Sequence, residues 1–381
     1  MPAAFRKVYN LREAKLKFMN AALALLIFLG IWLWGPAFLF AEELPVFYRG
    51  VRPLGMGGAF TAVADDENAM FYNPAGLNNI QGFHGMEILN PIVEVGTNTI
   101  DFYQDLDDAL DASTQTERDQ KTADVLTRSI GEHLHMRASL FPNVVFHNFG
   151  LGILGQGFFD GEPNHPMGET FPLLQVRAGY DLALLLSGAH GIFGQYLQIG
   201  LTAKIIRRSL VDKGYTVREI VDQDGISLSD DIKHGVGIGS DVGAILRLPI
   251  LFTPAIGITV QNVGDIDLDK AGKIPQQINA GVALKPPFPL GQLVLAADVV
   301  DIGKELGNDN DQYKRLHLGA EYSPIGMLSL RAGLNQGYPT FGATLNLWLL
   351  KIVGAYYVEE IGAFAGQRDD QRYVVQASIG F

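Results

Sequence analysis

Three histidines and a serine stand close together in the sequence and could do chemistry: His133, His135, His147 and Ser139. Imidazoles can hold zinc, and a serine activated by a histidine can attack an ester bond. However, the His-x-His pair has no third ligand nearby, and Ser139 lies in no nucleophile-elbow motif. We therefore predict no metal site and no catalytic residues, and we expect that the protein is not an enzyme.

A glycine-rich stretch, Gly55-Met56-Gly57-Gly58, suggests a second kind of chemistry, phosphate binding. Its spacing matches neither the dinucleotide fingerprint nor the P-loop, and no Lys-Ser/Thr follows it. A bend, a short helix over residues 67–71 and a stop at Asn73-Pro74 explain the pattern better, because proline restricts the residue before it. No cofactor is expected.

The composition excludes several other classes of site. The chain has 381 residues, 44 glycines and no cysteine. Without cysteine there can be no disulfide framework, no thiol nucleophile and no lipid attached to a processed cysteine.

The first 41 residues have the pattern of an export signal: a basic start, an apolar run from Phe18 to about Phe40, and Ala41 before the expected cut. An uncleaved membrane helix is the alternative, since the run is long enough to span a bilayer. Without residues 1–41 the chain keeps 24 basic and 40 acidic residues, a formal charge of −16. Such an acidic chain is not expected to bind nucleic acid.

From residue 83 onward, short segments alternate between apolar residues and polar residues or glycines. The segment 328–335 is an example, with two distinct faces: Leu328, Leu330, Ala332 and Leu334 against Ser329, Arg331, Gly333 and Asn335. This alternation predicts β-strands with one apolar face.

The links between these strands are alternately short and long. Short links fall near 148–150, 188–194, 249–251, 286–290, 323–326 and 349–351, and longer ones at 98–134, 160–171, 211–231, 264–274, 301–312, 335–339 and 361–370. A transmembrane barrel has tight periplasmic turns and long outer loops, whereas a soluble sandwich has no reason for this asymmetry. We predict an all-β fold, a transmembrane antiparallel barrel of about 14 strands over residues 83–381, with the longest loop, 98–134, partly helical.

The last strand indicates where the barrel resides. Tyr373 and the terminal Phe381 lie on its apolar face, and an aromatic final residue on such a strand resembles the signal that barrel-assembly machinery recognises. The sequence therefore predicts a multi-pass protein of the bacterial outer membrane, in contact with outer-membrane lipid.

The stretch 52–77 resembles the start of the FadL/TodX family of hydrophobic-compound transporters and of the related PorV/PorQ proteins. Both carry a glycine-rich stretch, an acidic pair and a Tyr/Trp-Asn-Pro-Ala element, here Tyr72-Asn73-Pro74-Ala75. In the FadL family this element belongs to a hatch that closes the barrel lumen. The resemblance implies that residues 42–82 form a hatch or plug, marked by seven residues: Gly55, Gly57, Gly58, Asn73, Pro74, Ala75 and Gly76.

Two further sets of residues are candidates for a role in the barrel wall. Gly152, Gly155 and Gly157 lie on the most glycine-rich strand, where a kink could open the wall sideways; alternatively, these glycines only relieve crowding in the lumen. Arg247, Glu321 and Arg331 fall on polar faces, and we expect them to brace the plug.

The resemblance suggests two functions. The first is passive transport of hydrophobic small molecules, such as long-chain fatty acids or hydrocarbons, past the hatch. The alternative is an accessory or shuttle barrel that binds a partner protein without transporting small molecules. A hydrophobic pocket between the outer loops and the hatch would favour transport, and a lumen packed solid with side chains would favour partner binding. A general diffusion porin is disfavoured by the plug.

Overall fold

Antiparallel strands with one apolar face make up most of the chain. The structure is a computed structural model and describes residues 44, 46–80, 83–166, 171–193, 196–222, 232–306 and 311–380. The predicted export signal, residues 1–41, and the terminal Phe381 lie outside the described residues.

The strands form one closed antiparallel sheet of 14 strands, which confirms the predicted fold. Three of these strands are interrupted: β1 (Phe83–Leu89) continues as β2 (Ile92–Gly96), β3 (Leu134–Leu140) as β4 (Asn143–Phe146), and β12 (Gln277–Leu284) as β13 (Pro287–Phe288). The others are β5 (Phe149–Asn164), β6 (Leu173–Ile192), β7 (Leu197–Thr216), β8 (Lys233–Arg247), β9 (Ala255–Gln261), β14 (Gly291–Val299), β15 (Leu316–Ile325), β16 (Leu328–Asn335), β17 (Tyr338–Leu347), β18 (Leu350–Glu360) and β19 (Asp369–Gly380).

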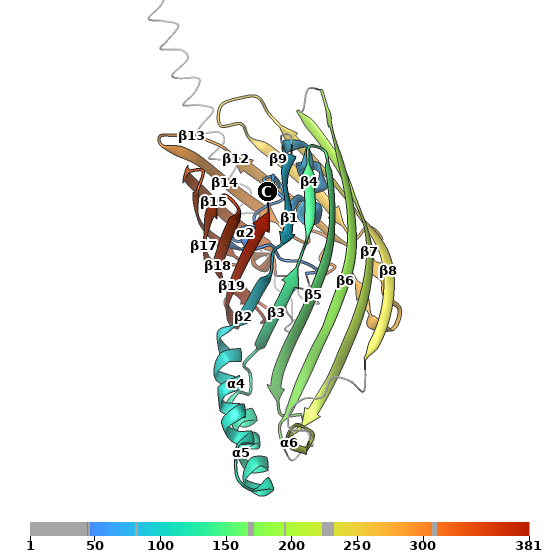
Figure 1. The fold of residues 1–381 in the computed structure, drawn as a ribbon, viewed down its shortest axis with the longest axis vertical. Coiled ribbons are helices and arrows are strands. Elements are labelled where there is room, and N and C mark those ends of the chain that lie inside the picture. The colour runs from blue at the N-terminus through green and yellow to red at the C-terminus, as the bar shows by residue number, and fades with distance from the viewer. Residues whose placement is uncertain are drawn as a thin grey trace, which may run out of the picture. The chain divides into compact units, whose positions relative to one another are not determined.

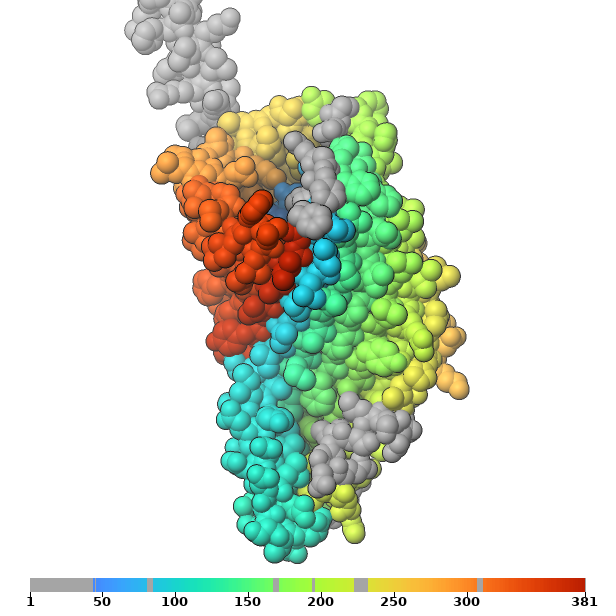
Figure 2. Space-filling model, viewed as in Figure 1, coloured from blue at the N-terminus to red at the C-terminus, as the bar shows by residue number. Residues whose placement is uncertain are grey.

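The barrel closes where the last strand meets the first. Strand β19 pairs with β1 through Glu87↔Gly380 and with β2 through Gly96↔Arg372. Figure 2 shows the blue first strand between the red last strand and the green second strand. A closed sheet leaves no edge, so the ladder can satisfy backbone groups even where no water is present.

Side chains sort onto the two faces of the sheet as the alternation predicts. Outward residues such as Leu330, Phe341 and Val375 are exposed, whereas inward residues such as Glu321 and Arg331 are buried. The apolar face therefore points away from the lumen, as lipid contact requires.

Strands β5, β6 and β7 are longer than a membrane needs. β6 and β7 have 20 residues each, whereas about 9–11 tilted residues cross a bilayer. The loops predicted at 160–171 and 211–231 are therefore wrong in extent: β5 runs on to Asn164 and β7 to Thr216. The inward polar pattern continues through both stretches, but the sequence alone offered no reason to extend the strands beyond the bilayer.

Helices cover the outer face of this extension: α4 (Thr97–Leu110), α5 (Gln115–Arg128) and α6 (Val217–Asp222). They share an apolar core with the strands, which includes Phe102, Val125, Leu126, Leu174, Val176, Tyr215 and Ile220. Helix α5 begins where the Thr114 hydroxyl accepts a hydrogen bond from the Glu117 N–H at 3.3 Å. Figure 1 shows the helices together at one end of the strands. No helix within the described residues is long and apolar enough to cross a membrane.

The loop between β9 and β12 folds back into the barrel. It holds the short pair β10 (Ile266–Asp267) and β11 (Lys273–Ile274), joined by a 3-10 helix at Asp269–Ala271. Ile266 and Leu268 are buried against glycines on the inward face of β8, at Gly235, Gly237 and Gly239. A further 3-10 helix, Tyr313–Arg315, precedes β15.

Candidate functional site

The N-terminal segment, residues 46–80, lies against the inward face of the barrel. It contains α2 (Val51–Gly55), α3 (Ala69–Tyr72) and a 3-10 helix at Pro74–Asn79. The backbone N–H groups of Phe60 and Thr61 donate hydrogen bonds of 2.8 and 2.7 Å to the carboxylate of Asp298 on β14. Most of its apolar side chains are fully buried and form one core with inward residues of the wall. The segment therefore fills part of the lumen.

Glycines on the inward face of the wall allow this segment to approach closely. A Cβ at Gly200 would lie 2.3 Å from the Ala75 nitrogen, and one at Gly243 would lie 2.0 Å from the Asn73 side-chain oxygen. Within the segment, Gly57 has a φ of 63° and no room for a side chain, since a Cβ would lie 2.4 Å from the Leu318 carbonyl oxygen. Glycines on the inward faces of β7 and β8 thus lie where the segment passes closest to the wall.

The Asn-Pro-Ala element fixes the turn after α3. The Asn73 amide donates to the Thr61 carbonyl at 2.8 Å, and its oxygen accepts from the Ala75 N–H at 3.2 Å. Pro74 starts the 3-10 helix, where its missing N–H costs nothing. Gly76 packs against Ala64 so tightly that a Cβ would lie 1.9 Å from its carbonyl oxygen. Gly55 touches the wall at Gly342, and Gly58 touches His317.

One arginine of the segment, Arg52, pairs with a carboxylate of the wall and with two carboxylates of the segment itself. The Arg52 guanidinium donates to both Glu321 oxygens at 2.8 and 2.7 Å, and to Asp65 and Asp66 at 2.7 and 2.8 Å. Arg331 pairs with the same Glu321 and donates to a neighbouring threonine hydroxyl on the wall. Glu321, a residue of the wall, therefore pairs both with Arg52 of the segment and with Arg331 of the wall.

Arg247 lies apart from this cluster. It is near the short-turn end of β8, where its backbone N–H donates to the Tyr196 carbonyl at 2.7 Å. Its Nε is buried without a hydrogen-bond partner among the described residues, and its charge acts on Asp65 only through a longer-range attraction. The bracing role of Arg247 therefore stays a prediction, whereas Glu321 and Arg331 share one ion-pair cluster.

Two further cations, one on the segment and one on the wall, join the segment to the wall. Arg49 of the segment pairs with Glu359 of β18 at 2.7 Å, and Lys351 of β18 pairs with Glu67 at 3.2 Å. Inward polarity marked the wall residues, but nothing in the sequence paired them with so distant a segment, as the separation of 310 positions between Arg49 and Glu359 illustrates.

The electrostatics of Asp65 follow from its two cations. Burial alone would raise the pKa of Asp65, but Arg52 at 2.7 Å and Lys285 at 3.1 Å hold the pKa well below its ordinary value. The carboxylate is therefore charged wherever the barrel is folded at neutral pH.

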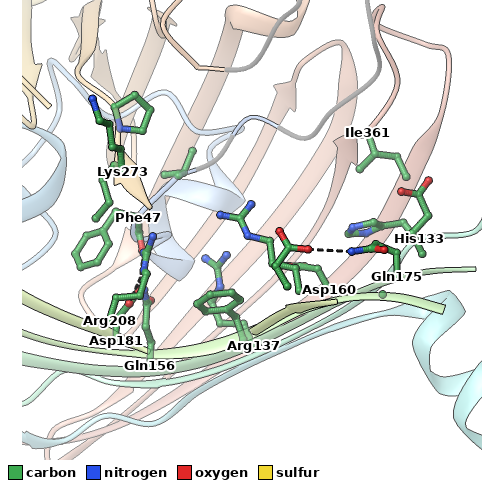
Figure 3. A pocket seen from close by; sticks show the side chains of 18 of the residues that line it. Phe47, His133, Arg137, Gln156, Asp160, Gln175, Asp181, Arg208, Lys273 and Ile361 are labelled. Atoms are coloured by element: carbon green, nitrogen blue, oxygen red, sulfur yellow. Dashed lines mark hydrogen bonds and ion pairs between the residues drawn. The ribbon is translucent and has the colours of Figure 1, made fainter. Parts of the chain in front are cut away.

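A cavity of about 340 Å³ lies between the segment and the extended wall of β5–β7. Figure 3 shows Arg137, Asp160 and Arg208 pointing into it from the strands, with Phe47 beside Arg208. Its lining is strongly charged, with five cations and four carboxylates: Arg137, Arg177, Arg208, Lys273 and Arg368 with Asp160, Glu162, Asp181 and Asp212. A second cavity of about 90 Å³ continues past Phe47, Tyr48 and Phe71. The lumen is thus neither open nor packed solid.

The wall has a seam where two neighbouring strands are interrupted by proline. Pro142 accepts a hydrogen bond from the Ile153 N–H at 3.0 Å, and Pro91 accepts one from the Ala377 N–H at 3.1 Å, but neither can donate one back. Between the two strands the side chain of Asn90 bonds the backbone of Phe141, at 2.7 and 2.6 Å, in place of a ladder pair. Three adjacent ladders are therefore weakened at one level.

An aromatic cluster closes the seam from inside. The ring of Phe141 lies 4.9 Å from that of Phe71 and 6.0 Å from that of Tyr48, and Phe141 is fully buried. Two side chains of the N-terminal segment thus cover the weakest place in the wall.

The glycines predicted to open the wall lie beside this seam, not at its centre. β5 pairs with β6 without interruption from Phe149 to Asn164. Gly152 points inward against the Phe141 ring, whereas a Cβ at Gly155 would have no atom within 4 Å and one at Gly157 would have only one, at 3.9 Å. The interruption occurs in the facing strand, because Pro142 removes a donor that glycine would keep.

The histidines serve as ion-pair and hydrogen-bond partners. His135 lies between Glu94 and Asp160, with both nitrogen–oxygen distances 2.6 Å, and His147 bonds the Ile80 carbonyl. No group of three or more potential ligands in the described residues is placed to hold a metal ion. Ser139 forms no hydrogen bond with either histidine in the part of the chain that the structure describes.

The aromatic residue predicted on the outer face of the last strand lies there. Tyr373 is exposed, and its ring is 5.3 Å from that of Tyr356 on the neighbouring strand. Both rings therefore face the surroundings of the barrel and not the lumen.

The fold and the filled lumen define the class: a closed outer-membrane-type β-barrel that holds its own N-terminal segment. No family model and no curated protein matches the chain. Two solved structures, the deltaS2S3 and deltaS2 mutants of the TodX monoaromatic hydrocarbon channel, are each 11% identical with a TM-score of 0.51, covering 87% of this chain and 98% and 97% of theirs. The Ralstonia pickettii toluene transporter TbuX is 14% identical with a TM-score of 0.49, covering 87% of this chain and 98% of its own. By its likeness to the two TodX structures, the chain has the fold of a FadL/TodX-type barrel, as the motif resemblance implied.

Proposed function

We propose that this protein is a passive outer-membrane channel for hydrophobic small molecules, in which residues 42–82 act as a hatch and the ligand leaves through the wall. The observation that carries the proposal is the seam at Pro91 and Pro142, covered by aromatic side chains of the N-terminal segment. A barrel whose only role was structural would gain nothing from three weakened ladders at one level, since unpaired backbone groups in lipid are costly.

The cavities supply the rest of the route. A ligand entering between the long loops would meet the charged cavity first, then pass Phe47 and Tyr48 to reach Phe141. Movement of the Phe141 ring would open the seam to the acyl chains outside. The ion pairs of Arg52 and Arg49 would meanwhile hold the hatch in the lumen, so water and ions would not follow.

A second candidate function, binding of a partner protein without transport, is favoured by the charged lining of the larger cavity. An apolar ligand gains little from five cations and four carboxylates, whereas a polar polypeptide segment could pair with them.

The test repairs the seam. Pro142→Val restores an N–H opposite the Ile153 carbonyl, and Pro287→Val, in β13 on another part of the wall, is the matched control. Cells that lack other hydrophobic channels would express each variant, and uptake of a radioactive long-chain fatty acid and of an alkylbenzene would be measured.

We expect uptake by the parent and by Pro287→Val, and loss of most uptake in Pro142→Val. Equal uptake by all three would exclude exit through the seam. No uptake by the parent, together with a protein that co-purifies with it, would favour the second function.

A further inference from the structure

The short turns at one end of the barrel are apolar, although turns of this kind face the aqueous periplasm in outer-membrane barrels. Four of them, residues 248–254, 286–290, 325–327 and 347–349, contain no charged residue, whereas the long link 264–274 contains five. Figure 1 shows β13, which leads into one of these turns, at the end of the barrel opposite to α4 and α5. The apolar turns therefore lie away from the extended strands and their helices.

Two of these turns hold a large side chain where glycine is favoured. Trp348 and Leu349 connect β17 with β18, and Pro289 and Leu290 connect β13 with β14. Trp348 has a φ of 70° and Leu290 a φ of 62°, a left-handed conformation that bulky residues rarely adopt. They are also the two most exposed large apolar side chains among the described residues, at 89% and 86%. In water, both the backbone and the side chain of each residue would be unfavourable.

Backbone hydrogen bonds hold neighbouring turns side by side. The Lys285 N–H donates to the Phe252 carbonyl at 2.8 Å, which joins the turn after β8 to the turn after β13. In the same way, the Asn346 N–H donates to the Met327 carbonyl at 2.8 Å and joins the turn after β15 to the turn after β17. The exposed apolar residues of these turns therefore belong to one rim of the barrel, which we call the apolar rim.

The apolar rim continues the lipid-facing surface of the wall. On β17 and β18 the outward pairs nearest the turn are Leu345↔Ile352 and Leu347↔Leu350, and Trp348 follows directly. No polar residue interrupts this outward face before the turn. The surface that contacts acyl chains thus runs onto the turn without a boundary.

The strands that end in the apolar rim have little length to spare. β9, β14 and β16 have 7, 9 and 8 residues, whereas about 9–11 tilted residues cross a bilayer. Strands of this length cannot carry their turns clear of the membrane. The excess length of β6 and β7 lies at the other end, beside the helices.

We propose that the apolar rim is embedded in the periplasmic leaflet of the outer membrane, at the boundary between the acyl chains and the head groups of phospholipids, with Trp348 and Leu290 inserted there. Three observations favour lipid over a periplasmic protein as the occupant: the rim continues the lipid-facing wall, its turns carry no charge, and its strands are short. An indole suits this boundary because its ring is apolar and its N–H can bond to a head group. Contact with lipid compensates for the exposure and the backbone conformation of both residues.

Fluorescence measures the position of the rim directly, because Trp348 is the only tryptophan after residue 41. The full chain would carry Trp32→Phe and Trp34→Phe and be placed in dioleoylphosphatidylcholine vesicles, with iodide on both sides or with lipids brominated near the head group or near the chain end. We expect strong quenching by bromine near the head group and weak quenching by iodide. The control is Tyr103→Trp in a chain that also carries Trp348→Phe, since Tyr103 is exposed on α4 at the other end of the barrel. We expect iodide to quench it strongly.

A second variant tests the energetic role of the inserted side chain. Trp348→Gly relieves the left-handed backbone but removes the indole. The control is Lys304→Gly, because Lys304 is exposed in a long loop with a φ of 58° and glycine changes its backbone in the same way. In urea unfolding from the same vesicles, we expect Trp348→Gly to shift the midpoint to lower urea by more than Lys304→Gly does.

Two results would overturn the proposal: quenching of Trp348 by iodide as strong as that of the Tyr103→Trp control, or a midpoint for Trp348→Gly no lower than that for Lys304→Gly. Either would place the rim in water, where a periplasmic protein could bind it. Neither measurement involves uptake, so this proposal and the proposed transport function fail independently.

Discussion

Replacing Arg52 by alanine should loosen the N-terminal segment from the wall. Arg52 donates four hydrogen bonds to three carboxylates, Glu321, Asp65 and Asp66, and its side chain is 18% exposed. Removing one partner of a buried ion pair costs about 3–5 kcal/mol, because the remaining charges stay buried. Only Glu321 of these three carboxylates belongs to the wall, and Arg331 and Lys285 still face Glu321 and Asp65, so we take the lower end, about 3 kcal/mol.

That free energy determines how much more often the N-terminal segment is displaced from its position in the lumen. Each 1.4 kcal/mol is about a tenfold change in an equilibrium, so the ratio of displaced to seated segment should rise by about two orders of magnitude. Single-channel recording in planar bilayers measures this ratio as the fraction of time spent in open, ion-conducting states. Arg52→Lys keeps the charge but loses the two-bond pairing with Glu321, and we expect an intermediate open fraction.

The control is Arg218→Ala, which removes an arginine whose side chain is 85% exposed on α6. It should conduct like the parent. Heat-dependent migration on gels would establish that each variant still forms a barrel. If Arg52→Ala folds and stays closed as often as Arg218→Ala, the ion pairs do not hold the segment, and the assignment of Arg52 is refuted.

Four further outcomes follow from the same contacts. Arg331→Ala should raise small-solute leakage in liposome swelling, but less than Arg52→Ala, because the polar contacts of Arg331 are with the wall; leakage equal to that of the parent would contradict this. Gly200→Val should displace the segment and raise leakage, whereas Gly155→Val, with open space around it, should not. Phe141→Ala should destabilise the barrel by about 3–5 kcal/mol in urea unfolding and widen the seam to bulkier ligands. Because the pKa of Asp65 is lowered, its ion pairs contribute stability above about pH 4 and lose it only as the pH falls further, so the difference in leakage between the parent and Asp65→Asn should be constant from pH 8 to about 5.

Much of the fold followed from the sequence because a barrel in a membrane obeys local rules. Alternation indicated the strands and their faces, and the alternating link lengths indicated the strand number, since each strand must return across the same bilayer. The inward charges at Glu321 and Arg331 were found in the same way. These inferences need only the period of the strand and the length of the links.

The partners of those charges could not be predicted, because they depend on how a separate segment enters the lumen. Nothing local connects Arg52 with Glu321, which are 269 positions apart, or separates Arg247 from their cluster. The position of the seam in the wall could not be predicted from the sequence either. Gly152, Gly155 and Gly157 looked weak on composition, but two prolines on different strands, Pro91 and Pro142, lie at one level only because the register of the closed sheet brings them there.

The sequence by itself thus determined which residues face lipid and which face the lumen, since the pleat of a strand fixes that for every second residue. Only the tertiary structure decided where the N-terminal segment meets the wall, which carboxylates Arg52 binds, and where the ladder is weakest. Those features depend on strand register and on contacts between distant parts of the chain, and neither is encoded by any short stretch of residues.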